Sequence, residues 1–245
     1  MNRIDVHCHF LPDQDDGCED LGESLECLRT MAAHGYNRVF CTPHCGSSDF
    51  TELTCEGVAE RVRELQGHVT EAGIPIELRA GGELRLSPHL AEDLPRMGVP
   101  TYGHGGKYVL ADLWEADWPV WATRGVEWLQ KRGLTVIIAH PERMPVMRGN
   151  PGFIAELAKL GVLFQGNLGP IAGADSAGIV ALAQRFLQDG RYFMVGTDGH
   201  RANHMEARLA GLKRVEELVG KEKLEELTVR NPGRLWAVAP PPTTT

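Results

Sequence analysis

The sequence has no apolar run approaching the roughly 20 residues that a membrane-spanning helix needs, and its first residues lack the charged-then-apolar pattern of a signal peptide. It also has no cluster of lysine or arginine. The 25 basic residues are scattered among 33 acidic ones, which gives a net charge of -8. Binding of a nucleic-acid backbone requires clustered cations, so these absences disfavour both a nucleic-acid partner and membrane insertion. We therefore expect a cytoplasmic protein.

Cysteine is absent from the last three quarters of the chain. The cysteines of the first quarter are irregularly spaced and lack the paired Cys-x-x-Cys pattern of a zinc ribbon. Because the cytosol keeps thiols reduced, we expect small, buried or partly exposed thiols, with a catalytic cysteine as the less favoured alternative. These residues are Cys8, Cys18, Cys27, Cys41, Cys45 and Cys55.

Neither a linker nor an internal repeat interrupts the chain, whose 245 residues suffice for one large α/β domain or two small ones. Seven apolar or alternating segments indicate strands, and stretches with helical periodicity separate them. Their alternation predicts a single α/β domain over residues 1–236, an irregular (β/α)7 TIM-like barrel with a parallel sheet. Residues 237–245, rich in proline and threonine, are expected to be a disordered tail. The strand segments are 3–12, 37–44, 76–80, 108–113, 135–140, 162–167 and 192–198.

Histidines and carboxylates gather at the ends of these strand segments. His7 and His9 lie two residues apart, so both point to the same side of the first strand. A single His-x-His pair means little, but six of the seven strands deliver such a residue to the mouth where the strand ends of a barrel meet. Charged groups clustered in this way repel each other unless cations neutralise them. We predict metal ligands at His7, His9, Asp16, His44, Glu83, Asp112, His140, Asp198 and His200.

Nine ligands exceed the capacity of one ion and indicate two or three divalent ions, with Glu83 as a bridging carboxylate. The mixture of nitrogen and oxygen ligands favours zinc, manganese or iron(II) over magnesium alone. A centre of this kind supplies hydroxide at neutral pH and stabilises charge on the attacking and leaving oxygens. The expected reaction is therefore hydrolysis, of a phosphate ester or of an amide.

Two arginines decide in favour of the phosphate ester. Arg143 follows the fifth strand and can make a two-pronged contact with phosphoryl oxygens. Arg201 lies beyond the seventh strand and is the second candidate for binding the substrate's phosphate. The alternative is that either arginine pairs with a local carboxylate, such as Glu142 or Glu206. The predicted catalytic residues are Arg143, Asp198 and His200, the last two as candidate proton donors.

The motifs that carry these residues resemble those of the polymerase-and-histidinol-phosphatase (PHP) superfamily. The closest resemblance is to the bacterial tyrosine-protein phosphatases associated with capsule and exopolysaccharide synthesis. It extends from Met1 to Trp236, and the order and spacing of all motifs make it specific. The matching segments are Ile4-Asp5-Val6-His7-Cys8-His9-Phe10-Leu11-Pro12 with Asp15-Asp16-Gly17, Thr42-Pro43-His44, Gly81-Gly82-Glu83, Ile138-Ala139-His140-Pro141-Glu142-Arg143, Gln165-Gly166-Asn167, Thr197-Asp198-Gly199-His200 and Asn231-Pro232.

This resemblance implies a PHP barrel with a trinuclear centre, commonly of manganese or iron with some zinc, on the nine residues named above. It also implies that Arg143 binds phosphate, and that the substrate is phosphotyrosine on a polysaccharide co-polymerase or an autokinase. The sequence departs from the family at two places. The family usually has glutamate where Asp112 stands, and its arginine beyond the Asp-x-His motif has no clean counterpart, although Arg201 or Arg208 could replace it.

Three other functions are compatible with the same residues. The chain could hydrolyse a different phosphoester, such as histidinol phosphate or another small phosphomonoester, or a phosphodiester as a nuclease. It could be a non-catalytic, metal-stabilised scaffold that binds a kinase. It could also be an amidohydrolase, although no predicted strand ends in a lysine that could be carboxylated.

Four tryptophans follow the fourth predicted strand. Trp114, just after Asp112, is the best candidate for the edge of a substrate site. For the others, packing against the neighbouring helical layer is the simpler expectation. They are Trp118, Trp121 and Trp128.

Overall fold

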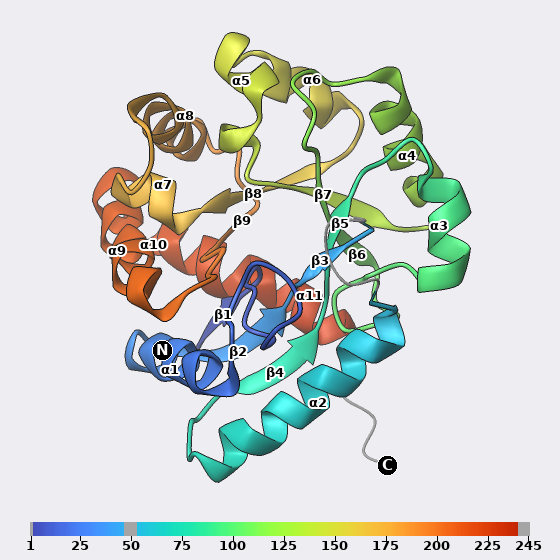
Figure 1. Ribbon diagram of the computed structural model, residues 1–245. Helices are drawn as coiled ribbons and strands as arrows, with labels where there is room; N and C mark the ends of the chain where they lie inside the picture. Colours follow the sequence, from blue (N-terminus) through green and yellow to red (C-terminus); the bar gives the residue numbers. More distant parts are fainter. Residues whose placement is uncertain (1, 47–52, 240–245) are drawn as a thin grey trace.

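Parallel strands form the interior of the protein, whose computed structural model describes residues 2–46 and 53–239 (Figure 1). The described strands form a three-stranded sheet in the order β1-β2-β4 and a six-stranded sheet in the order β3-β5-β6-β7-β8-β9. All neighbouring strands in both sheets are parallel. The strands are β1 (Arg3–Asp5), β2 (Tyr36–Cys41), β3 (His44–Cys45), β4 (Glu77–Ala80), β5 (Glu83–Arg85), β6 (Tyr108–Asp112), β7 (Thr135–Ala139), β8 (Leu163–Asn167) and β9 (Met194–Gly196).

The second and third predicted strands are each interrupted once. Residues 42–43 separate β2 from β3, and residues 81–82 separate β4 from β5. Pro43 has no N–H to give to the ladder. A Cβ on Gly82 would lie 2.6 Å from the Cβ of Pro100, so the backbone here approaches its neighbour as only glycine can. The nine short strands therefore occupy the seven predicted positions.

The first and last strand segments meet at the carboxyl ends of the strands. Cys8 and Gly199 form an isolated parallel bridge. Beside it, the N–H of His9 donates to the carbonyl of Gly199 (2.8 Å), and the N–H of Asp198 donates to the carbonyl of His7 (2.7 Å). The prediction of an α/β fold with a parallel sheet is thus confirmed, and within the described residues it consists of nine strands in two sheets. The closed (β/α)7 barrel stays a prediction.

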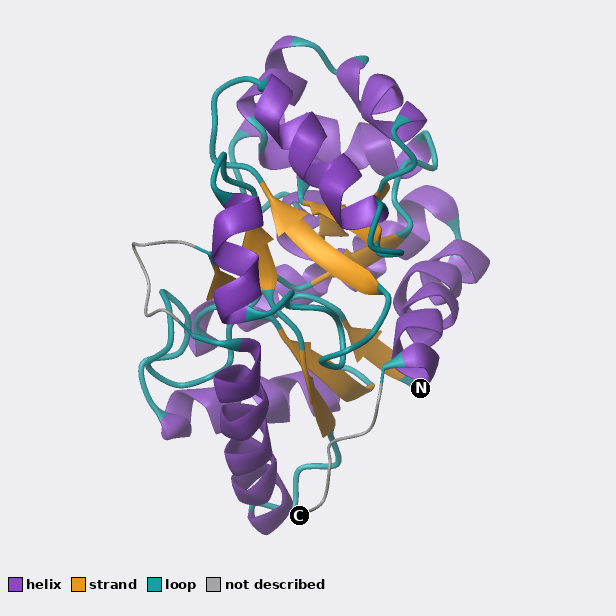
Figure 2. Ribbon diagram, turned by 90° about the vertical axis from the view of Figure 1, so that its right-hand side faces the viewer, coloured by secondary structure: helices purple, strands orange, loops and turns teal. Residues whose placement is uncertain are grey.

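Helices surround the strands in Figure 1, and Figure 2 shows the same arrangement turned by 90°. The long helices are amphipathic; α1, for example, buries Cys27, Leu28 and Met31. The helices are α1 (Leu21–Ala33), α2 (Cys55–Glu71), α3 (Leu90–Met97), α4 (Val120–Gln130), α5 (Pro145–Gly149), α6 (Phe153–Lys159), α7 (Leu168–Ala172), α8 (Ala177–Gln188), α9 (Ala202–Val219), α10 (Lys221–Glu225) and α11 (Asn231–Val238), with the 3-10 helix η1 (Pro141–Arg143) and the π-helix η2 (Glu226–Arg230).

Apolar side chains fill the space enclosed by the strands. Ile4, Phe40, Leu110 and Ile137 come from four different strands and form one buried cluster with Trp236 of α11. A larger cluster lies between the strands and the outer helices. The strand ends that carry the predicted ligands therefore stand on a close-packed support, which fixes the side chains that project from them.

The folded part of the chain extends further towards the C-terminus than predicted. Helix α11 continues to Val238, and Ala239 is buried, with its carbonyl accepting a hydrogen bond from Arg79 (2.9 Å). The predicted tail therefore begins too early, because residues 237–239 take part in this packing. Residues 240–245, the rest of that tail, lie outside the described residues. The assignment of the whole chain to one domain stays a prediction.

The six cysteines are all buried and all free, as expected for reduced structural thiols. The sulfur atoms of Cys18 and Cys27 are 3.8 Å apart. Among the helices in the described residues, none combines the length and the apolar composition required to cross a membrane.

The packing of α9 on α7 leads to a test with two glycines. Gly211 of α9 lies so close to α7 that an added Cβ would be 2.3 Å from the carbonyl oxygen of Leu168. Gly211→Ala is expected to destabilise the protein by about 1–3 kcal/mol, because the backbones must separate. Gly67→Ala in α2 is the matched control. With no atom within 4 Å of the new Cβ, it is expected to stabilise by about 0.5–1 kcal/mol. Denaturant unfolding measures both, and shifts of the same sign would contradict the close contact.

Candidate metal centre

The predicted ligands all lie at the carboxyl ends of the parallel strands. The parallel β-bridge between Cys8 and Gly199 places the His-x-His and Asp-x-His motifs side by side. His7 and His9 lie on either side of Cys8, and Asp198 and His200 lie on either side of Gly199. On the opposite part of the curl, His44 of β3 pairs in register with Glu83 of β5. These pairings bring residues that are far apart in sequence to one place.

Three overlapping groups of side chains could each hold a metal ion, because the ligand atoms within a group lie within 4.8 Å of one another. Eight of the nine predicted ligands belong to these groups, and His7 and His9 each belong to two. The groups are His7, Glu83 and His140; His7, His9 and Asp198; and His9, Asp16, His44 and His200.

Glu83 lies at the centre of the cluster and is 1% exposed. One carboxylate oxygen is 2.9 Å from Nε2 of His140. The other is 3.1 Å from Nδ1 of His44, 3.3 Å from Nε2 of His7 and 3.5 Å from Nε2 of His9. A carboxylate among four imidazoles is placed where it could contact more than one ion, and its bridging role stays a prediction.

Asp112 lies at the edge of the cluster, outside the three groups. Its Oδ1 is 3.8 Å from Nδ1 of His140 and accepts a hydrogen bond from the backbone N–H of Leu113 (2.6 Å). Its Oδ2 accepts a hydrogen bond from the indole N–H of Trp114 (2.7 Å). The buried Nδ1 of His140 has no hydrogen-bond partner in residues 2–46 and 53–239. A cation between Asp112 and His140 would satisfy that nitrogen.

The charges of the cluster favour bound cations. Burial by itself would raise the pKa of Glu83, but the imidazoles around it, His7 first, hold this pKa well below its usual value. Burial would lower the pKa of His44, yet the hydrogen bonds that it donates to the carboxylates of Asp16 and Glu83 raise it to about 9. Neighbouring carboxylates likewise raise the pKa of His140 to about 10 against the effect of burial. Carboxylates that stabilise protonated imidazoles in this way would also stabilise divalent metal ions at the same place.

The histidine nitrogens are oriented as metal ligands usually are. Nδ1 of His7 lies 2.8 Å from Oε1 of Gln165, and Nδ1 of His9 lies 2.6 Å from Oδ2 of Asp15. Their Nε2 atoms face each other at 3.2 Å in the middle of the cluster. A hydrogen bond at one ring nitrogen fixes the tautomer and leaves the other for the metal. The donor set therefore fits divalent ions such as zinc, manganese or iron(II).

Three supporting residues were not predicted as part of the site. Asp15, the neighbour of the predicted ligand Asp16, also accepts a hydrogen bond from the backbone N–H of His44 (3.0 Å). Gln165 and Asn167 come from β8, the one predicted strand without a ligand, and Asn167 donates to Oδ2 of Asp198 (2.7 Å). The Gln-Gly-Asn segment was already visible as a motif, but its role required the contacts.

Two of the predicted ligands have an unusual backbone conformation. His140 has φ = 28° and Asp198 has φ = 49°, both in the left-handed region that side chains other than glycine rarely adopt. Residues held in such conformations cluster at functional sites, where the surrounding structure enforces them. The strain at both strand exits therefore supports a functional role for this end of the sheet.

Arg143 lies beside the cluster. Its Nη1 is 3.4 Å from Oδ2 of Asp198 and its Nη2 is 3.4 Å from Oδ2 of Asp175. The Nε is buried without a hydrogen-bond partner among the described residues, while the side chain as a whole is 37% exposed. This position, half-open and next to a ligand, suits a group that receives a phosphate.

Arg201 is directed elsewhere. Its guanidinium pairs with Glu19 and Glu23 and donates to the carbonyl of Gly17 (3.0 Å). These contacts give no support to the predicted phosphate contact and agree with the alternative of pairing with carboxylates, although the partner is not the neighbour Glu206 that we had considered. Arg208 instead lies close to the cluster, with Nη1 3.5 Å from Oδ2 of Asp198.

Comparison with known proteins agrees with this geometry. The family described as "Capsular polysaccharide synthesis, CpsB/CapC" matches residues 3–237. The tyrosine-protein phosphatase YwqE of Bacillus subtilis (strain 168) is 28% identical over 197 residues, 80% of this chain and 77% of that protein. The tyrosine-protein phosphatase CpsB of Streptococcus pneumoniae is 24% identical over 241 residues, 95% of this chain and 97% of that protein.

A solved structure shows the same fold. It comes from a study of YwqE from Bacillus subtilis and CpsB from Streptococcus pneumoniae as unique metal-dependent tyrosine phosphatases. It superposes with a TM-score of 0.86 at 26% identity and covers 99% of this chain and 100% of that chain. The likeness therefore spans all strands whose ends form the cluster.

Proposed function

Because the chain belongs to the CpsB/CapC family of capsular polysaccharide synthesis, as its motifs led us to expect, we propose that it is a metal-dependent phosphomonoester hydrolase. Its substrate is phosphotyrosine on a protein of polysaccharide synthesis, a kinase or a co-polymerase, in the cytoplasm. The observation that carries this proposal is the overlap of three His–carboxylate groups at one end of the strands, with Arg143 beside them.

We assign to the centre two or three divalent ions, of manganese, iron or zinc. When bound, such ions activate water at neutral pH and neutralise charge on a phosphoryl group. Asp112 belongs to this set through its approach to His140, at the position where a cation would satisfy the buried Nδ1. The ligands are His7, His9, Asp16, His44, Glu83, Asp112, His140, Asp198 and His200.

Arg143 holds the phosphate of the substrate. Asp175 and Asp198 fix its two terminal nitrogens at 3.4 Å each, so the fork is oriented before the substrate arrives. An oriented guanidinium binds two phosphoryl oxygens at once and stabilises the charge that they carry in the transition state. Since these groups are already in place, little reorganisation accompanies the reaction.

The leaving group of the proposed reaction, a tyrosine phenolate, depends little on a proton donor in the protein. A tyrosine phenolate has a pKa of about 10, so it needs less help from a proton donor than an alkoxide does. Asp198 and His200 are the candidate donors. Burial raises the pKa of Asp198, but surrounding histidines, His7 first, hold it well below its usual value, so this carboxylate stays ionised. His200 gives its Nδ1–H to the carbonyl oxygen of Asp198 (2.9 Å), and its Nε2 faces Asp16 in the proposed ligand set, so water held at the centre would be the better proton donor.

A comparison of substrates tests the proposal. Purified protein loaded with manganese, iron or zinc is assayed on a phosphotyrosine peptide, on histidinol phosphate and on an aryl phosphodiester, beside elemental analysis of metal per chain. We expect kcat/KM to be at least about tenfold higher for the peptide, since one well-fitting pocket contact supplies that discrimination. Preference for histidinol phosphate would indicate a small-molecule phosphatase. Absence of all three activities would indicate the alternative of a non-catalytic, metal-stabilised scaffold that binds a kinase.

A further inference from the structure

Trp114 is the exposed aromatic residue nearest the cluster. Its side chain is 39% exposed, and among the described large hydrophobic residues with such exposure it is the one aromatic side chain. It lies two residues beyond Asp112, at the exit of β6. Its ring centroid is 5.6 Å from that of His44, and the two rings are almost perpendicular. An exposed indole that contacts a proposed metal ligand is well placed to bind the substrate.

Two polar contacts hold this indole in place. The N–H donates to Oδ2 of Asp112 (2.7 Å). The guanidinium of Arg85 stacks over the ring, with its central carbon 4.1 Å from the ring centroid, a distance typical of a cation–π contact. A ring fixed at both its edge and its face loses little freedom when a ligand packs against it, so it is pre-organised for binding.

The register of the strands explains why these residues lie together. Glu83 and Arg85 are two apart in β5 and project from the same face. Arg85 pairs in register with Asp112 of the neighbouring β6. Arg85 and Asp112 therefore lie one layer outside Glu83, and Trp114 follows Asp112 by two further residues. A phosphomonoester bound beside Glu83 would extend its organic part outward, past Arg85 and Trp114.

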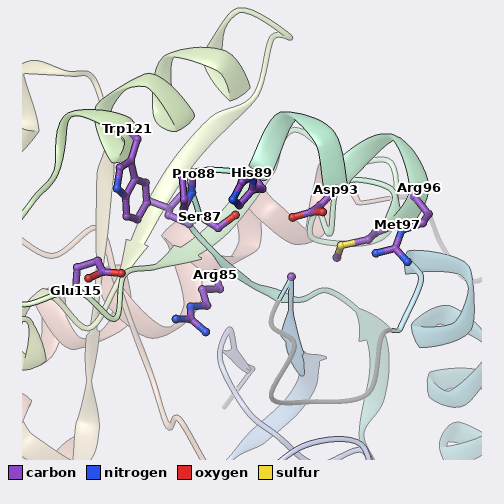
Figure 3. A pocket seen from close by; sticks show the side chains of 11 residues that line it. Arg85, Ser87, Pro88, His89, Asp93, Arg96, Met97, Glu115 and Trp121 are labelled. Carbon is purple, nitrogen blue, oxygen red and sulfur yellow. The ribbon is translucent and has the colours of Figure 1, made fainter.

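A cavity lies in the surface next to Arg85. A cavity of about 260 Å³ is lined by Arg85 and by Glu115, the neighbour of Trp114. Figure 3 shows Arg85 between Glu115 and Trp121 on one side and Arg96 on the other. The cavity is smaller than the roughly 300–1,000 Å³ of a small-molecule pocket. It provides space next to Arg85 for one side chain of a substrate.

We propose that Trp114, held by Arg85 and Asp112, is the surface against which the aromatic ring of phosphotyrosine packs. It makes the centre select aryl over alkyl phosphate monoesters. This inference rests on the proposed phosphatase function, and it names the residue that determines its substrate class. Aromatic pairs prefer offset or edge-to-face contacts, and such a contact adds to the area that both rings bury.

Binding of two non-hydrolysable probes tests this selectivity in the metal-loaded protein. Calorimetry compares phenylphosphonate with methylphosphonate on the wild type, Trp114→Ala and Trp114→Phe. The wild type is expected to bind the phenyl compound more tightly, and Trp114→Ala to lose about three- to tenfold of that preference. Trp114→Phe should keep most of it. The kcat/KM ratio between phosphotyrosine and phosphoserine peptides of one sequence should fall in parallel.

Trp128→Ala is the matched control. Trp128 of α4 is stacked under Arg132 in the same way, with 3.2 Å from the guanidinium carbon to the ring centroid, but near the amino end of β7. Trp128→Ala should leave the ratio of the affinities for phenylphosphonate and methylphosphonate unchanged, even if it lowers the thermal midpoint.

An unchanged affinity ratio in Trp114→Ala would overturn the inference while leaving the proposed phosphatase function intact. Equal weakening of both probes with loss of metal would also overturn it, because Trp114 would then only support Asp112. A wild type that neither binds the probes nor hydrolyses phosphate would overturn both proposals.

Discussion

Replacing Glu83 with glutamine is expected to lower kcat by on the order of 100- to 1,000-fold, with loss of metal from the protein. Glutamine has the shape of glutamate but no charge, so the change removes the carboxylate that lies within 3.5 Å of four imidazoles. The histidines would then lose the common anion that holds two groups of ligands together. Steady-state rates and elemental analysis on the same samples measure the two effects.

A second readout separates loss of metal from loss of fold. A ligand present at 100 times its Kd stabilises a protein by about 2.7 kcal/mol, so a chelator should lower the thermal midpoint of the wild type. It should have little effect on Glu83→Gln, which has already lost the ions. Glu77→Gln is the control, since Glu77 is exposed at the start of β4 and pairs with Arg79. A Glu83→Gln protein with full, metal-dependent activity would refute the proposed centre.

Replacing Arg143 with lysine is expected to lower kcat/KM for a phosphotyrosine peptide by about 100-fold or more, while the metal content stays at the wild-type level. Lysine keeps the positive charge but cannot reproduce the planar fork that contacts two oxygens. Asp175 and Asp198, which orient that fork, would bind the shorter side chain at one point. Kinetics with saturating metal isolate the loss of phosphate binding.

Two other arginines provide the comparison. Arg148→Lys changes an exposed residue of the adjacent α5 and should have no effect on the rate. Arg201→Lys should have little effect on kcat/KM, because its partners are Glu19 and Glu23 and not the cluster. If Arg201→Lys were as damaging as Arg143→Lys, the sequence-based assignment of Arg201 to the phosphate would be restored.

The positions of the proposed ligands could be predicted because strand exits are local features. A segment such as residues 135–140 reads as a buried strand from its apolar, β-branched side chains, and its exit is where His140 lies. Parallel strands then bring such exits to one end without further information. The breaks at Pro43 and Gly82 were harder to predict, since the tight approach of Gly82 to Pro100 depends on packing.

Roles that depend on contacts between distant segments could not be predicted. Arg201 meets Glu19 across 182 positions of sequence, and no local pattern signals that pairing. Asp15 and Asp16 are adjacent carboxylates, and the family resemblance selected Asp16 as the ligand. The contact of Asp15 with His9 depends on the path of the loop and could not be predicted.

The bridge between Cys8 and Gly199 sets the order in which the protein can mature. The carbonyl of His7 and the hydroxyl of Thr197, which meet beside the bridge at 3.2 Å, are separated by 190 positions. Contacts of such separation form late, because the intervening chain must first be ordered. A ribosome-bound chain that has not yet released its last strand can therefore hold His44 and Glu83 but not the complete cluster. Complete occupancy of the proposed centre would therefore require the finished chain, because a chain that ends before residue 198 lacks both Asp198 and His200.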